Sequence, residues 1–328
     1  MKRRVFLKNI VIGSSSIILP LSLNASPNRS NKTLKFGVCA DVHNDIMHDG
    51  IKRIEKFIGE AQKRDLDFII QLGDFCRPYP YNQIFLDKWN SYSADKFHVL
   101  GNHDMDGGFS REQVIEFWGA SQKYYSIDKD GFHIIVLDGN DKNPSPNKAS
   151  GYARFIGEVQ KQWLKADLRK TDKPCIVFSH QTLEDNSDGI ENRADIRDIF
   201  KTENNRAGYK KVMACFSGHH HTDYATRIDG IYYIQINSMS YSWLGEDYKT
   251  IRYSKEIDEK HEWIKYTVPY KDPLFAFVKI DDSSIKIKGV QSSFVGPSPK
   301  ELGVPEQPEN KRITPNITDR KLSVSDLN

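Results

Sequence analysis

The sequence lacks several features that mark particular classes of protein. None of its apolar runs reaches about 18 residues, which is close to the length that a membrane-spanning helix needs. Its formal net charge is only +3. The first 25 residues hold four basic residues and no acid, so the rest carries 43 basic and 44 acidic residues, a charge of −1. We therefore expect no internal membrane span, no span after loss of the N-terminal segment, and no nucleic-acid partner bound through bulk charge.

Cysteine is also scarce. The four cysteines are Cys39, Cys76, Cys175 and Cys215, and three of them lie within apolar runs. None has the spacing of a zinc ribbon or of a catalytic thiol motif. An oxidising compartment would permit disulfides, although the sequence alone fixes no pairing. We expect buried thiols that act as small apolar side chains.

Residues 1–25 have the composition of a targeting signal. A basic start is followed by a moderately apolar stretch from Asn9 to Leu23, and Leu23-Asn24-Ala25 suits a signal peptidase. The pair Arg3-Arg4, followed by Val-Phe-Leu-Lys, resembles the twin-arginine export signal of bacteria. A plain signal peptide or an uncleaved anchor is the alternative. This segment predicts contact with the export machinery and a periplasmic or secreted protein.

After a polar linker at 26–33, strands and helices alternate up to residue 290. Apolar runs predict strands at 34–40, 67–72, 96–100, 174–179 and 212–217, and helical spacing predicts helices at 51–63, 110–118 and 158–170. Residues 238–272 have no regular pattern, and the Pro- and Lys-rich extension at 291–328 is typical of a surface tail.

Two-residue turns predict antiparallel pairs within this pattern. Asp130-Gly131 and Asp229-Gly230 each separate two apolar runs, as in tight β-hairpins. A later hairpin is expected across residues 281–284. Antiparallel hairpins among β/α units favour a layered α/β fold with mixed sheets over a purely parallel one.

Five of the predicted strands end in side chains that commonly bind metals. Because the carboxyl ends of strands in open α/β sheets face one crevice, these side chains can converge. Two metal ions about 3.5–4 Å apart need a bridging carboxylate, and imidazole and carboxylate ligands suit Zn, Mn and Fe. The five junctions are Asp41-Val42-His43, Gly73-Asp74, Gly101-Asn102-His103-Asp104, Ser179-His180 and Gly218-His219-His220-His221.

In this order, the motifs resemble those of the calcineurin-like metallophosphoesterases, over roughly residues 34–290. The resemblance implies a catalytic domain there, with two mixed β-sheets sandwiched between helices and a dinuclear site at the sheet edge. It implies one metal held by Asp41, His43, Asp74 and His221, and a second held by Asp74, Asn102, His180 and His219. The expected cofactors are therefore two divalent or trivalent ions (Mn, Fe or Zn).

The resemblance also implies roles in catalysis. His103 would protonate the leaving group, and Asp104 would orient His103. A metal-bridging hydroxide would attack phosphorus in line, which predicts an exported hydrolase of small-molecule phosphate esters. Arg77, where relatives place other residues, could contact a substrate phosphate or be an ordinary loop arginine. A phosphodiesterase, a nucleotide pyrophosphatase and a non-catalytic phosphate-binding protein are the alternatives.

Overall fold

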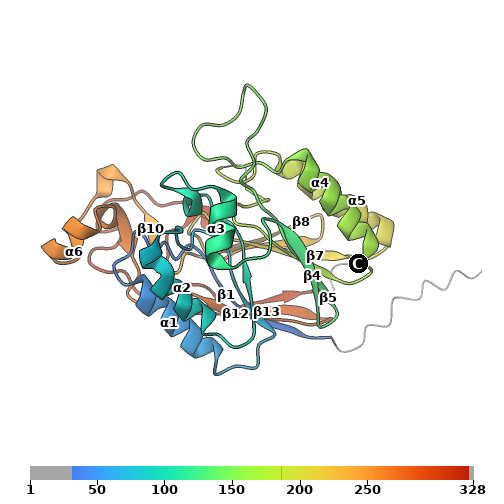
Figure 1. The fold of residues 1–328 in the computed structure, drawn as a ribbon, viewed down its shortest axis with the longest axis horizontal. Coiled ribbons are helices and arrows are strands. Elements are labelled where there is room, and N and C mark those ends of the chain that lie inside the picture. The colour runs from blue at the N-terminus through green and yellow to red at the C-terminus, as the bar shows by residue number, and fades with distance from the viewer. Residues whose placement is uncertain (1–31, 186, 325–328) are drawn as a thin grey trace, which may run out of the picture. The chain divides into compact units, whose positions relative to one another are not determined.

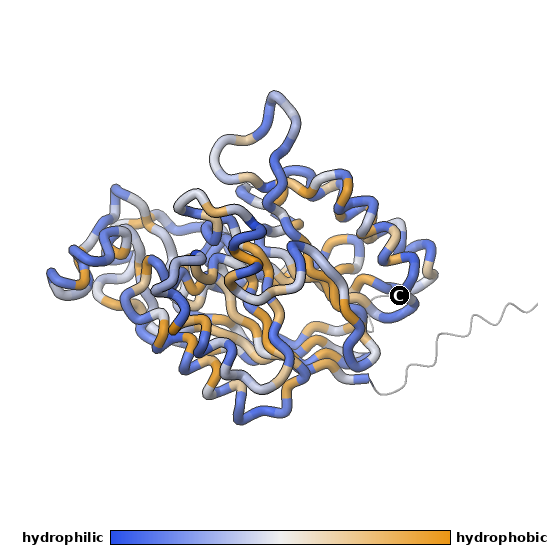
Figure 2. Tube along the Cα trace, in the orientation of Figure 1, coloured by the Kyte–Doolittle hydropathy of each residue, from blue (hydrophilic) through white to orange (hydrophobic). Residues whose placement is uncertain are grey.

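Two six-stranded sheets lie face to face between two groups of helices (Figure 1). The structure, a computed structural model, describes residues 32–185 and 187–324. The predicted signal at 1–25 and most of the linker at 26–33 lie outside the described residues. Apolar side chains from both sheets fill the space between them, and Figure 2 shows the apolar residues concentrated along these strands. The predicted four-layer α/β architecture is confirmed.

Sheet 1 has the strand order β14-β13-β12-β1-β2-β3. Pairing is parallel between β1, β2 and β3 and antiparallel elsewhere, so the sheet is mixed. Its strands are β1 (Leu34–Cys39), β2 (Phe68–Gln71), β3 (Asp95–His98), β12 (Ala276–Ile280), β13 (Ser284–Gly289) and β14 (Arg320–Ser323).

Sheet 2 has the order β4-β5-β6-β7-β9-β8, with β5, β6, β7 and β9 parallel and an antiparallel strand at each edge. The two edge hairpins turn at Asp130-Gly131 and Asp229-Gly230, where every φ is positive, so both predicted hairpins are confirmed. The strands are β4 (Tyr125–Lys129), β5 (Phe132–Val136), β6 (Cys175–Phe178), β7 (Val212–Ser217), β8 (Tyr224–Ile228) and β9 (Ile231–Gln235).

Helices cover the outer faces of both sheets. α1 (Gly50–Ala61), α2 (Gln83–Asn90) and α3 (Arg111–Trp118) bury apolar residues against sheet 1. α4 (Glu158–Lys170) and α5 (Arg193–Ala207) bury theirs against sheet 2. α6 (Lys255–Lys260) is short, and 3₁₀ turns occupy Pro80–Asn82, His103–Met105, Glu246–Tyr248, Ile264–Tyr266 and Glu309–Lys311. In the part of the chain that the structure describes, no helix has the length and apolarity to cross a membrane.

Several details differ from the sequence-based predictions. The segment after Val290 is not simply a surface tail, because β14 pairs with β13 and Ile317 and Val324 enter the core. Residues 238–272 contain a two-stranded ribbon of β10 (Tyr241–Trp243) and β11 (Thr267–Pro269). All four cysteines are buried and unpaired, as expected.

Candidate metal centre

The carboxyl ends of β1, β2 and β3 of sheet 1 meet those of β6 and β7 of sheet 2 at one edge of the sandwich. Backbone hydrogen bonds join the loops: Asp41 N donates to the Gly73 carbonyl, and Gly218 N donates to the His180 carbonyl. These loops carry two groups of side chains whose ligand atoms lie close enough to hold a metal ion, Asp41 with His43 and His221, and Asp74 with His180 and His219. The structure thus brings together residues that are up to 180 positions apart.

The backbone of these loops is strained where the predicted ligands sit. A left-handed backbone costs a residue other than glycine roughly 1–2 kcal/mol, and such strain gathers at functional sites. This left-handed backbone turns each ligand side chain inward soon after its strand ends. The predicted ligands with positive φ are Asp41 (51°), His43 (48°), Asp74 (50°), His219 (71°) and His221 (53°).

Two glycines allow the loops to approach each other. Gly73 has φ +94°, and a Cβ there would lie 2.6 Å from Nδ1 of His180. A Cβ on Gly101 would lie 2.2 Å from the backbone nitrogen of Asp74. Any other residue would push the ligand loops apart.

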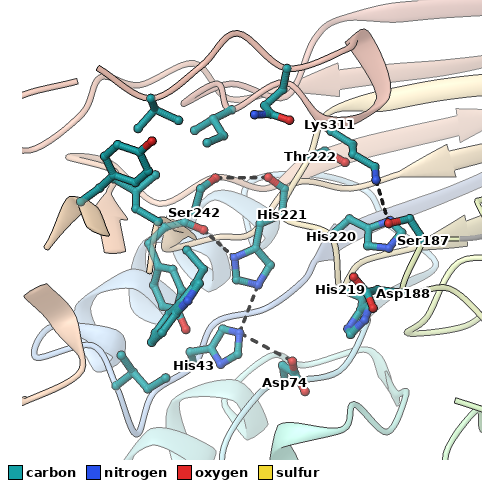
Figure 3. A pocket seen from close by; sticks show the side chains of 18 of the residues that line it. His43, Asp74, Ser187, Asp188, His219, His220, His221, Thr222, Ser242 and Lys311 are labelled. Atoms are coloured by element: carbon teal, nitrogen blue, oxygen red, sulfur yellow. Dashed lines mark hydrogen bonds and ion pairs between the residues drawn. The ribbon is translucent and has the colours of Figure 1, made fainter. Parts of the chain in front are cut away.

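The first group is built around His221, which comes from the loop after β7. His221 Nδ1 donates to the Tyr241 carbonyl at 2.7 Å, so the lone pair of Nε2 faces the site. That Nε2 lies 3.2 Å from Nε2 of His43 (Figure 3). It also lies 3.3 Å from Asp41 Oδ1. Burial lowers the pKa of His43 well below its usual value, which favours the neutral ring that binds metals.

The second group repeats this arrangement around His180. Its Nδ1 donates to the Leu72 carbonyl at 2.7 Å, and its Nε2 lies 3.3 Å from Asp74 Oδ2, 3.1 Å from Asn102 Oδ1 and 3.2 Å from His219 Nδ1. Burial alone would lower the pKa of His180, but the Asp74 carboxylate raises it to about 9. The site therefore draws positive charge to this nitrogen, where a metal cation can replace the proton.

Asp74 lies between the two groups. One oxygen, Oδ2, is 3.6 Å from Nε2 of His43 and 3.3 Å from Nε2 of His180. Ligand atoms about 2.0–2.2 Å from a shared metal stand roughly 3.0–3.5 Å apart, so these spacings fit two adjacent ions that share one carboxylate. The Asp74 carboxylate attracts positive charge to the point where these nitrogens meet, and a bound cation would supply that charge.

His103 lies at the rim of this centre, with its ring centre 5.3 Å from that of His43. Its Nδ1 is 2.7 Å from Asp106 Oδ2 and 3.2 Å from the Tyr152 hydroxyl, which donates to Asp106 Oδ1. Burial alone would lower the pKa of His103, but the carboxylates of Asp74 and Asp106 raise it, which favours the protonated ring.

The expectation that Asp104 orients His103 is wrong. The Asp104 carboxylate accepts hydrogen bonds from the backbone nitrogens of Gly101 (2.8 Å), Asp74 (3.0 Å) and Phe75 (2.7 Å). It therefore ties together the loops after β2 and β3. Asp106 is the carboxylate that contacts the His103 ring.

Sequence reasoning missed both Asp106 and Tyr152. Asp106 stands three residues after His103, and the 3₁₀ turn His103–Met105 brings the two side chains together, so the His-x-x-Asp spacing was a usable signal. Tyr152 belongs to a long loop and gives no local signal. Arg77 lies beside the centre, with its Nη2 3.3 Å from Asp106 Oδ2.

A cavity of about 750 Å³ opens beside the centre. His43, Asp74 and His103 line one side, and Trp243 of β10 lines another. The C-terminal segment contributes Lys311, whose ammonium group donates to the Ser187 hydroxyl at 2.7 Å (Figure 3). The cavity is within the range of about 300–1,000 Å³ that holds organic ligands.

Comparison with known families agrees with this geometry. A family model described as calcineurin-like phosphoesterase matches residues 34–223, more than half of the chain. The chain belongs to the calcineurin-like phosphoesterase family, and two candidate metal groups fit the dinuclear site expected there. A search of curated protein sequences finds no significant match.

Solved structures share the fold at low sequence identity. A dimetal phosphatase from Danio rerio is 16% identical with a TM-score of 0.59, and the match covers 81% of this chain and all of the other. An anchor protein of the inner membrane complex of Plasmodium is 17% identical with a TM-score of 0.56, over 89% of each chain. At these identities the likeness establishes the fold alone.

Proposed function

We propose that this protein is an exported hydrolase of phosphate esters that uses two metal ions, Mn, Fe or Zn. The observation that supports this most directly is the Asp74 carboxylate between two groups of histidine nitrogens whose lone pairs face inward. When bound, the two ions supply an acidic water and polarise the phosphoryl oxygens.

The chain's own residues complete the reaction. His103 stands at the rim with Nδ1 on Asp106, so its other ring nitrogen can donate a proton to the departing oxygen. Asn102 presents its amide next to His180, and Arg77 approaches from the loop after β2. Cationic and amide donors at these positions can stabilise charge on a phosphoryl group.

The cavity bears on the choice of substrate. Its volume exceeds what a phosphate group alone fills, and Trp243 and Lys311 offer an aromatic surface and a second cation. A phosphate ester with a sizeable organic group fits it. Phosphodiesterase and nucleotide pyrophosphatase activities remain the alternatives. A non-catalytic binding protein is less favoured, because His103 and all of the predicted ligands are present.

A hydrolysis panel with added Mn, Fe or Zn tests the proposal. It compares nitrophenyl phosphate, bis-nitrophenyl phosphate, nucleoside diphosphates and sugar phosphates, with Asp74→Asn as the control. Metal-dependent turnover on at least one substrate, lost in the control, is expected. Tight binding of phosphate esters without turnover would favour the non-catalytic alternative.

Export rests on the sequence alone. The Arg3-Arg4 pair and the apolar stretch after it support a twin-arginine route to the periplasm or the medium. Arg3→Lys with Arg4→Lys is expected to leave precursor in the cytoplasm, measured by fractionation. Normal export of this variant would point to the general secretory route.

A further inference from the structure

The outer face of sheet 1 carries a row of four lysines on four neighbouring strands. Lys279 of β12 lies opposite Lys35 of β1 on one side and opposite Lys286 of β13 on the other. Lys286 in turn lies opposite Lys321 of β14. Alternate residues of these strands enter the core between the sheets, so the lysines share the opposite face. At a strand spacing of about 4.8 Å, the row is roughly 14 Å long.

This row is an unfavourable arrangement for the folded protein by itself. Like charges directly opposite each other on paired strands destabilise a sheet. Among the described residues, Lys279, Lys286 and Lys321 have no acidic partner. Lysine on an exposed edge strand can prevent aggregation, which accounts for Lys321 on β14. It does not account for Lys279 and Lys286, because β12 and β13 are paired on both sides.

A groove of about 600 Å³ runs beside the lysines. Phe277 and Leu66 are among the residues that line it, and the Arg64 guanidinium lies 4.0 Å above the centre of the Phe277 ring. Lys288, in ion pair with Asp319, adds a further cation to its wall. The groove is therefore cationic along its walls and partly apolar at its base.

We propose that this groove binds a linear phosphate polymer, independently of the metal centre. A single file of cations matches the charges of an extended chain. Acids stand at its margins, since the Asp65 side chain is 95% exposed beside Lys35 and that of Asp319 is 47% exposed. They would repel a broad anionic surface such as a membrane. The row itself contains only lysines, which bind phosphate groups as point charges.

Binding is tested on the full chain with inorganic polyphosphate as the probe and inorganic phosphate as the monomer. Asp74→Asn serves as the background, so that hydrolysis and binding at the metal centre do not contribute. The row variant is Lys279→Gln, Lys286→Gln and Lys321→Gln. The control, Lys170→Gln, Lys255→Gln and Lys300→Gln, removes the same charge from exposed lysines elsewhere.

Polyphosphate is expected to bind more tightly than phosphate, and more weakly as salt increases. The row variant should lose about 100-fold in affinity and the control far less, since each lysine near a polyanion contributes about fivefold. Equal losses in the two triple variants would overturn the proposal. Tighter binding of a sulfated polysaccharide than of polyphosphate would also overturn it. So would a row variant that binds polyphosphate unchanged but no longer binds anionic vesicles, because that result would assign the face to a membrane.

Lys286→Glu provides a second readout. It places an acid between Lys279 and Lys321, so it should raise the midpoint of thermal unfolding while weakening polyphosphate binding. Stability and binding would then change in opposite directions, as expected of a surface selected for a ligand. A lower midpoint, or polyphosphate binding as tight as in the wild type, would contradict the proposal.

Discussion

Histidines at the two ends of sheet 2 have opposite surroundings. At the carboxyl end, His180 donates through Nδ1 to a backbone carbonyl and turns Nε2 toward a carboxylate and other lone pairs. At the amino end, His133 of β5 has a carboxylate on each nitrogen, Asp128 at 2.8 Å and Asp167 at 2.8 Å. The surroundings of the His180 ring suit the binding of a cation, and those of the His133 ring favour a protonated, positively charged ring.

The difference shows how the partner of each ring nitrogen distinguishes a metal ligand from an ion pair. A carbonyl partner fixes the proton of one nitrogen and leaves the other nitrogen to bind either a proton or a metal ion. His221 repeats this arrangement with the Tyr241 carbonyl. Two carboxylate partners accept from both ring nitrogens, which raises the pKa and favours the charged ring. Substitutions at the carboxyl end should therefore change metal binding and turnover, whereas those at the amino end should change the pH dependence of stability.

The largest effect is expected from Asp74→Asn. One carboxylate serves both ligand groups, so its loss should release most of the bound metal and lower turnover by about 10⁴-fold or more. Metal per chain and turnover of the purified variant check this. Two full equivalents of metal with normal turnover would show that Asp74 does not bridge.

His103→Ala should keep both metals and still lose about 10²–10⁴-fold of the activity on alkyl phosphate esters. The loss should be distinctly smaller on nitrophenyl esters, because nitrophenolate leaves without a proton. Both rates are measured at saturating metal. An equal loss on the two substrates would mean that His103 positions the phosphoryl group, and loss of a metal would make it a ligand.

Asp106 and Asp104 offer a contrast only two residues apart. Asp106→Asn should preserve stability and metal content while lowering turnover on alkyl esters about tenfold, since its side chain contacts His103, Tyr152 and Arg77 at the rim of the centre. Asp104→Asn should lower the free energy of unfolding by about 2–3 kcal/mol, because an amide nitrogen in place of one carboxyl oxygen leaves at least one buried backbone donor without its acceptor. Urea unfolding measures the stability of the two variants, and turnover is measured on alkyl and nitrophenyl esters. A loss of stability in Asp106→Asn with a loss of turnover in Asp104→Asn would make Asp104 the orienting residue.

Local sequence was enough for the strands that lead into the ligand loops, for the hairpins and for the ligand loops themselves. Each predicted ligand directly follows an apolar strand, so its position depends on its neighbours in sequence and on the rule that parallel strands share an edge. The contact of Tyr152 with His103 depends on a long loop, and the pairing of β14 on distant packing. Neither leaves a periodic pattern. Asp104 was misassigned because adjacency to His103 suggested contact, whereas the 3₁₀ turn points the two side chains to different partners.

The smallest effect is expected at His133, and it should depend on pH. Burial alone would lower the pKa of His133, but hydrogen bonds to Asp167 and Asp128 raise it above its usual value. The raised pKa means that its contribution is fully present below the unfolded value of about 6.5 and is lost as pH rises through the folded-state pKa.

His133→Gln should therefore lower the free energy of unfolding by about 1 kcal/mol more at pH 5.5 than at high pH, where the ring is neutral. Urea unfolding across this range measures it. His98 is the matched control, since burial lowers its pKa to about 3 and it stays neutral throughout. Because His98 is neutral in the fold and gains a proton on unfolding below about pH 6.5, His98→Gln should cost less at pH 5.5 than at high pH, the opposite trend to His133→Gln. A pH-independent cost at His133 would mean that its pKa is the same in the folded and the unfolded protein, and that its two carboxylate partners do not favour the charged ring.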